Sequence, residues 1–196
     1  MSKFTKIIPY ILILAGVGII ILTFWPVAKE EVRYQARQII PQIVKPVDLT
    51  PPNKSFSIVI PKIEAVSAII AGVDPSDPKK YLPALRMGVA QAKGTALPGH
   101  IGNLYLFAHS TDAFYDVSAY NAVFFLIGKL QTGDEVDIYY QGKLFKYAVY
   151  DKKVVPPDDS YYFGTILPGQ KTLTLQTCYP PGTTLERLIV LAKQID

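Results

Sequence analysis

The feature that most constrains the fold of this chain is a series of short strand-like segments that runs from Ser55 to the C-terminus. The segments are rich in Val, Ile, Leu, Tyr and Phe, and Gly, Pro, Asn and Asp separate them. Branched and aromatic residues favour pleated strands, whereas Gly, Pro and Asn favour turns. The pattern therefore predicts an all-β domain over residues 55–196. The expected strands are FSIVIPKI at 56–63, NLYLFAH at 103–109, EVDIYY at 135–140, KLFKYAVY at 143–150, LTLQTC at 173–178 and RLIVLA at 187–192.

Two connections between these segments have the composition of hairpin turns. Gln141-Gly142 lies between one pair of segments, and Pro180-Pro181-Gly182 lies between the last pair. Short helices are expected at 79–87 and 119–130. Many short strands with frequent turns are typical of a closed barrel or a sandwich, and periodicity alone leaves both architectures open.

Residues 7–25 form an apolar run of 19 residues without a charge. A helix of that length crosses about 30 Å of hydrocarbon, and Trp25 at its end suits the membrane interface. The alternative is a cleaved signal peptide, which has a shorter apolar region followed by a small-x-small cleavage site. Only a weak site follows here, so we expect residues 1–27 to be a retained transmembrane anchor with a short cytoplasmic tail.

The orientation of this anchor is not decided by its flanking charges, because basic residues lie on both sides of it. The short N-terminal tail leaves the main domain to be exported, so we expect a single-pass protein of the cell membrane with residues 55–196 outside. Residues 28–40 are expected to form a short juxtamembrane helix. Residues 41–54 contain four prolines and predict an extended, semi-rigid linker.

The net charge of +4 lies outside the main domain. Residues 55–196 contain 13 basic and 13 acidic residues, whereas residues 1–54 contain the basic excess. Anionic lipid would attract basic residues beside a membrane. The main domain has no net basic surface charge, which argues against a nucleic-acid-binding protein.

Cys178 is the only cysteine, so neither an intrachain disulfide nor a cluster of thiolate metal ligands can form. In the strand 173–178 alternate residues share a face, and Cys178 shares its face with Thr174 and Gln176 rather than with the leucines. The thiol also ends the strand beside a Pro-rich loop, where functional side chains are often displayed. These features favour a functional thiol over the alternative of a small buried hydrophobic residue.

Arg187 is the expected partner of Cys178 across the last hairpin. The segment between them is centred between Gly182 and Thr183, so antiparallel pairing about that centre would place the two residues opposite each other. A guanidinium at this place could stabilise an oxyanion or hold the carbonyls of a peptide. The alternative is an ordinary solvated arginine.

The two histidines, His100 and His109, are both candidates for the acid/base that a cysteine enzyme needs. His109 ends an expected strand, whereas His100 lies in a turn before it. A rigid strand end aims a side chain better than a turn does, so His109 is preferred. The alternative for each is a loop histidine with no role.

Other motifs that would indicate a different chemistry are absent. The sequence has no nucleotide-binding glycine loop, no HExxH and no GxSxG. Asp112, Asp158 and Asp159 are not spaced as a metal-binding loop, so we expect them to be solvated. No cofactor and no metal are expected.

The sequence resembles the sortase family over about residues 55–196. Its most specific part is Thr174–Cys178, which fits the TLxTC strand that carries the nucleophile of the family. His109 matches the catalytic histidine of the family, and Arg187, nine residues after Cys178, matches its essential arginine. Supporting segments are Ile60–Ile63, Gly94–Gly99, Gly102-Asn103 and Leu130–Asp134.

The chain also departs from many relatives. Many sortases have a glycine where this chain has Ala108, and a histidine near the position of Gln91. Neither departure touches the three matched residues. Neither a second apolar span near the C-terminus nor a lid segment before Ile60 is evident, which disfavours a pilus-polymerising subtype.

The resemblance implies an eight-stranded sortase β-barrel and a transpeptidase. Cys178 would attack a threonine carbonyl in an LPxTG-like C-terminal sorting signal of an exported protein, Arg187 would stabilise the oxyanion, and His109 would protonate the leaving amine. An amine from a cell-wall precursor or a pilin lysine would then resolve the thioacyl-enzyme. The alternatives are a cysteine hydrolase with water as acceptor and a non-catalytic surface β-domain.

Overall fold

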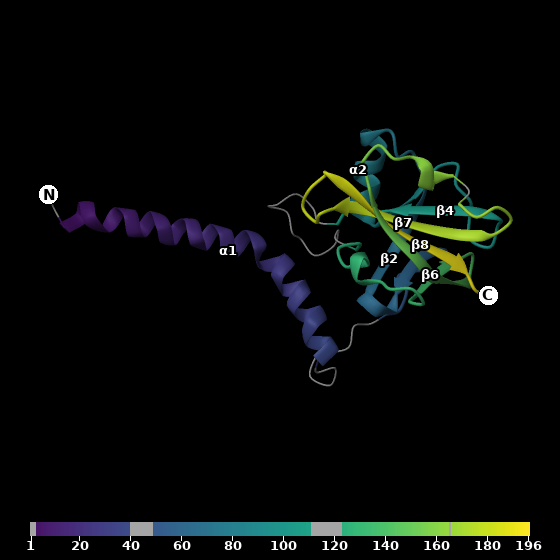
Figure 1. Cartoon of the computed structure of the whole chain (residues 1–196), viewed down its shortest axis with the longest axis horizontal. Helices are drawn as coiled ribbons and strands as arrows, with labels where there is room; N and C mark the ends of the chain where they lie inside the picture. The colour runs from purple at the N-terminus through teal and green to yellow at the C-terminus, as the bar shows by residue number, and fades with distance from the viewer. Residues whose placement is uncertain (1–2, 40–48, 111–122, 165) are drawn as a thin grey trace. The chain divides into compact units, whose positions relative to one another are not determined.

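A computed structural model describes residues 3–39, 49–110, 123–164 and 166–196 of the chain. The chain divides into two compact units, one with the N-terminal helix α1 and one with a β-barrel (Figure 1). Helix α1 spans Lys3–Ile39 as one helix of 37 residues. The juxtamembrane helix predicted at 28–40 is thus the continuation of α1, and most of the predicted linker lies outside the described residues.

The predicted membrane span at 7–25 lies within α1 but is not confirmed. In the part of the chain that the structure describes, no helix combines the length and apolar character required of a membrane span.

Eight strands close into a barrel, which decides between the two architectures that the sequence left open. Their order around the barrel is β1-β2-β3-β4-β7-β8-β6-β5. The pairs β2–β3 and β4–β7 are parallel, and the other six pairs are antiparallel. The strands are β1 (Phe56–Ile60), β2 (Ala65–Val73), β3 (Val89–Ala92), β4 (Gly102–Phe107), β5 (Glu135–Tyr140), β6 (Lys143–Val155), β7 (Lys171–Tyr179) and β8 (Glu186–Gln194).

The interior of the barrel is filled by one set of alternating side chains. On β7 this set comprises Leu173 and Leu175, which are fully buried, as the sequence pattern predicted. Leu104 and Leu106 on β4 and Val190 on β8 are also buried. Closure of the sheet leaves no unpaired edge at these strands.

The opposite face of β4 and β8 is also buried, although it points away from the barrel interior. A second apolar cluster covers it, and this cluster includes residues of helix α2 (Pro78–Met87) and of the 3-10 helix η3 (Tyr161–Phe163). The barrel therefore has a covered outer surface beside β4, β7 and β8. Members of the cluster are Val73, Ala84, Leu85, Ala90, Ala92, Tyr105, Phe107, Val155, Tyr162, Ile189 and Leu191.

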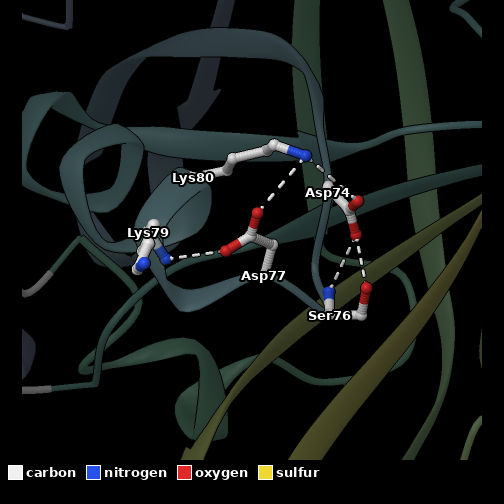
Figure 2. Close-up of polar contacts among 5 residues, drawn as sticks. All are labelled: Asp74, Ser76, Asp77, Lys79 and Lys80. Atoms are coloured by element: carbon white, nitrogen blue, oxygen red, sulfur yellow. Dashed lines mark hydrogen bonds and ion pairs between the residues drawn. The ribbon is translucent and has the colours of Figure 1, made fainter.

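Helix α2 confirms the helix predicted at 79–87, and its start is well capped. The Asp77 carboxylate accepts a hydrogen bond from the Lys79 backbone N–H at 3.0 Å (Figure 2). Pro78 occupies the first turn of the helix. The Lys80 ammonium lies 3.3 Å from Asp77 and 3.7 Å from Asp74. Hydrogen bonds from Ser76 lower the pKa of Asp74. The cap fixes where α2 begins over the outer face.

The hairpin between β5 and β6 was correctly predicted. Gln141 and Gly142 have φ values of 50° and 80°, as a two-residue turn that follows the strand twist requires. One other prediction was incomplete. The strand predicted at 56–63 ends at Ile60 and continues as the 3-10 helix η1 (Pro61–Ile63).

The remaining differences concern β2, β3 and a predicted helix. Strands β2 and β3 were missed, because their alanines and glycine weaken the strand signal. Of the helix predicted at 119–130, the described residues 123–126 form turns and are followed by the 3-10 helix η2 (Ile127–Lys129). The rest of it lies outside the described residues.

Candidate active site

Cys178 lies one residue before the end of β7 and faces Arg187 across the β7–β8 ladder. The register of this antiparallel pair runs through Cys178↔Arg187, which confirms the pairing expected from the symmetry of the loop. Side chains directly opposite each other share a face, with Cβ atoms about 5 Å apart. Both residues are half-buried, so the thiol is not sealed in the barrel interior.

His109 reaches the same end of the sheet from β4. The parallel β4–β7 ladder ends with Phe107↔Gln176, and its hydrogen bonding continues, because the Ala108 N–H donates to the Gln176 carbonyl at 3.1 Å. The Thr177 hydroxyl also donates to the Ala108 carbonyl at 2.9 Å. His109 therefore follows Phe107 by the same two residues by which Cys178 follows Gln176.

The alternation of side chains also places these residues on one face. Continuing the alternation of β4 puts His109 on the face of Tyr105 and Phe107, which is the outer face covered by the second cluster. Cys178 alternates with the buried interior residues of β7, so it too lies on the outer face. The outer end of three neighbouring strands thus carries a thiol, an imidazole and a guanidinium.

His100 lies elsewhere. It is exposed in the turn before β4, and its backbone N–H donates to the Leu97 carbonyl at 3.1 Å. The six residues of β4 separate this turn from the end where His109 lies. A strand of this length spans about 20 Å, so His100 is far from the Cys178 end of the sheet. The structure therefore places His109, and not His100, at the candidate site.

The Arg187 guanidinium is held by the loop that joins β7 and β8. Its Nη1 donates to the carbonyls of Thr184 at 3.2 Å and Glu186 at 3.0 Å. The same loop is closed by two hydrogen bonds from Thr183 to the Pro180 carbonyl, at 3.0 Å from the N–H and 2.8 Å from the hydroxyl. These contacts tie Nη1 of the guanidinium to the loop between β7 and β8.

Asn103 on β4 holds the η3 segment against the outer face, a role that sequence reasoning did not assign to it. Its side chain is 4% exposed, and its Nδ2 donates to the Tyr162 carbonyl at 2.7 Å. Its Oδ1 accepts from the hydroxyls of Thr172 at 3.1 Å and Thr174 at 3.0 Å. A buried amide that is satisfied on both ends ties three segments together.

Tyr105 is a second residue that sequence reasoning missed. Its ring stacks on Phe163 of η3, with centroids 4.0 Å apart and planes 13° apart. Its hydroxyl donates to Oε1 of Gln176.

Burial raises the pKa of Tyr105 well above its usual value, although the positive charge of Arg187 opposes this. The phenol therefore keeps its proton and acts as a donor. A tyrosine within a strand is usually interpreted as a core residue, so the sequence pattern alone does not predict its hydrogen bond to Gln176.

Of the acidic residues considered from the sequence, Asp159 makes a local contact. Asp159 accepts a hydrogen bond from the Tyr161 N–H at 2.9 Å, which closes the turn before η3. Asp112 lies outside the described residues. Within the described ranges, no group of three or more His, Cys, Asp or Glu residues is arranged to hold a metal ion.

Comparison with known proteins identifies the family of the chain. The sequence profile of the sortase domain matches residues 58–195, which includes the whole barrel except the first two residues of β1. The chain belongs to the sortase family. Sortase D of Bacillus subtilis strain 168 is 29% identical over 139 residues, which are 69% of this chain and 61% of that protein. This sortase chain therefore spans less than two thirds of the length of that relative.

Solved sortase structures share the fold. A sortase D5 transpeptidase from Clostridium perfringens is 27% identical with a TM-score of 0.59, over 85% of this chain and 89% of that one. Sortase A from Corynebacterium diphtheriae is 28% identical with a TM-score of 0.60, over 83% and 67% of the two chains. Sortase C-1 from Actinomyces oris is 26% identical with a TM-score of 0.62, over 86% and 98%. The resemblance of the sequence to sortases is thereby confirmed.

Replacing Asn103 tests whether this amide holds the η3 segment against the outer face of the sheet. Asn103→Ala removes the hydrogen bonds to the Thr174 hydroxyl and the Tyr162 carbonyl, so it should lower the free energy of unfolding by about 2–4 kcal/mol. Urea unfolding followed by circular dichroism measures the change. Gln131→Ala on the exposed surface is the control and should shift stability by less than about 0.5 kcal/mol. An Asn103→Ala protein as stable as this control would contradict the role.

Proposed function

We propose that this sortase is a cysteine transpeptidase that cleaves an LPxTG-like sorting signal and transfers the exported protein to an amine. The observation that carries the proposal is the register of β4, β7 and β8, which brings His109, Cys178 and Arg187 to one end of the outer face. The description of the Clostridium perfringens neighbour as a transpeptidase supports the same reaction class.

The first half-reaction forms a thioacyl-enzyme. The Cys178 thiolate attacks the threonine carbonyl of the sorting signal, and a C–S bond forms as the carbonyl oxygen takes up negative charge. Collapse of this intermediate breaks the C–N bond, and His109 donates a proton to the departing amine. The half-buried position of Cys178 suits this role, because a nucleophile must be reachable by a peptide.

The second half-reaction releases the product. An amine from a cell-wall precursor or a pilin lysine attacks the thioester, and His109 accepts the proton that the amine loses. The C–S bond breaks, and the thiolate of Cys178 is restored. An excess of a well-positioned amine would favour transfer over hydrolysis by water.

Arg187 is proposed to stabilise the oxyanion or the substrate carbonyls. Its Nη1 donates to the carbonyls of Thr184 and Glu186, and these bonds orient the planar guanidinium. The remaining N–H donors, on Nη2 and Nε, are then the groups proposed to bind the substrate. Directly opposite Cys178, such donors would lie near the carbonyl under attack. Preorganised donors at this place lower the barrier without reorganisation.

Membrane anchoring completes the proposal. The uncharged run at 7–25 would hold the enzyme in the cell membrane, with the barrel outside where exported proteins emerge. Confining enzyme and substrate to one surface raises their effective concentration.

Kinetics with a fluorogenic LPxTG peptide test the catalytic assignment. Cys178→Ala should reduce kcat/KM by at least about 10³-fold, because the nucleophile is lost. His109→Asn should reduce it by about 10²–10⁴-fold, the usual worth of general acid–base catalysis. His100→Asn, at the other end of β4, is the matched control and should retain wild-type activity. An added amine should appear in a new amide product by mass spectrometry.

Three results would decide against parts of this assignment. Full activity of the Cys178→Ala protein would exclude the thiol mechanism. Equal losses for both histidine variants would show that the position of His109 is not what matters. Cleavage that never yields an amide product, with any amine, would favour the cysteine hydrolase.

Membrane anchoring is tested by extraction. The full chain expressed in a bacterial host should stay in the membrane pellet after washing with alkaline carbonate. This wash removes proteins bound only to the membrane surface, whereas a protein held by a spanning helix stays inserted. A chain that lacks residues 1–27 should move to the soluble fraction. Release of the full chain by carbonate would contradict the anchor.

A further inference from the structure

Gln176 lies two residues before Cys178 on β7, and the two side chains share the outer face. In the sheet it is flanked by Phe107 on β4 and Ile189 on β8. Both neighbours are buried apolar residues, whereas Gln176 is half-buried. Two residues of an extended strand span about 7 Å. The Gln176 amide therefore lies about 7 Å along β7 from the Cys178 thiol, which is the length of two residues of an extended peptide.

Tyr105 fixes the orientation of the Gln176 amide. The phenol is 1% exposed and stacks on Phe163, so its hydroxyl has little freedom to turn to water. A buried hydroxyl needs an acceptor, and Oε1 of Gln176 accepts its hydrogen bond. Because an amide is planar, holding the oxygen against Tyr105 turns the NH₂ group to the other side.

The NH₂ group of Gln176 has no acceptor within the described residues. Among the described residues, the hydrogen bond from Tyr105 is the contact made by this side chain, and no oxygen accepts from its Nε2. The nitrogen is also not one of the buried polar atoms without a partner in the described part of the chain, so it is open to solvent or to a ligand. An oriented donor beside a nucleophile, on an otherwise apolar floor, is suited to bind a carbonyl.

We propose that Gln176 is a substrate-binding residue that donates from Nε2 to a backbone carbonyl of the sorting peptide, and that Tyr105 is its positioning residue. The carbonyl is that of the residue two positions before the threonine under attack. This inference rests on the function proposed above and adds to it a recognition of the peptide backbone.

The distance between Cys178 and Gln176 indicates which substrate carbonyl Gln176 binds. An extended peptide advances about 3.3 Å per residue, as the strand beneath it does, so two residues of peptide match the offset from Cys178 to Gln176. We place the bound carbonyl before the threonine, in the acyl part of the peptide, because this part stays bound to the enzyme through both half-reactions. The part after the threonine must leave before the acceptor amine can enter. A donor held rigidly by a buried tyrosine serves the part that stays.

A double-mutant cycle on the full chain tests the inference with the fluorogenic LPxTG peptide. Gln176→Leu keeps the volume but loses the donor, and Tyr105→Phe keeps the stack on Phe163 but loses the hydroxyl. Each change should lower kcat/KM by roughly 3- to 10-fold, mainly through KM, as expected for one neutral hydrogen bond. Tyr105→Phe should have no further effect in the Gln176→Leu background, because the positioned group is already gone.

A second readout separates recognition from a general distortion of the site. Alkylation of Cys178 by iodoacetamide needs no peptide, so its rate should be the same in wild type and in all three variants. A peptide with an ester after the proline, which weakens that carbonyl as an acceptor, should lose several-fold in wild type and little in Gln176→Leu.

The outcomes distinguish this inference from the function on which it rests. Wild-type cleavage that depends on Cys178, with Gln176→Leu as active as wild type, would overturn the role of Gln176 alone. Equal effects of Tyr105→Phe with and without Gln176, or slower alkylation in the variants, would mean a structural role. A wild-type chain that does not cleave the peptide would overturn the proposed function and this inference with it.

Discussion

The parallel pairing of β4 with β7 is the constraint on which the candidate site depends. The hairpin of β7 and β8 brings Cys178 and Arg187 together by local register alone. His109 is almost 70 residues upstream and reaches them only because β4 runs alongside β7 in the same direction, in a ladder that continues to Ala108. Parallel neighbours end at the same edge, so their last side chains meet there.

The outer face of the sheet has to be rigid for this meeting to be useful. Closure of the barrel buries one face of β4, β7 and β8, and the second apolar cluster with α2 and η3 covers much of the other. Asn103 and Tyr105 connect that cover to the sheet by buried polar and stacking contacts. Support from both sides holds the backbone of these strand ends in place, which is what an accurately positioned set of side chains requires.

The sequence predicted the parts of the site that follow from local rules. Strand alternation placed Cys178 away from the leucines, and the symmetry of the Cys178–Arg187 loop predicted their pairing. His109 was preferred over His100 as a strand end, but its nearness to Cys178 came from resemblance, because parallel pairing is not local. The roles of Asn103 and Tyr105 depend on partners 59 and 71 residues away, so no local pattern could reveal them. Likewise β2 was missed because an Ala-rich strand is specified by its neighbours rather than by its own residues.

The central claim is that the sulfur of Cys178 is the atom that takes up the acyl group of a sorting peptide. Acid quenching of the full chain with an LPxTG peptide, followed by digestion and mass spectrometry, tests it most directly. The account predicts a thioester on the fragment that contains Cys178, in a form that hydroxylamine removes, and a stronger signal when His109 is changed so that deacylation is slower than acylation. Peptide turnover without an adduct on that fragment, or with an adduct on another residue, would contradict it.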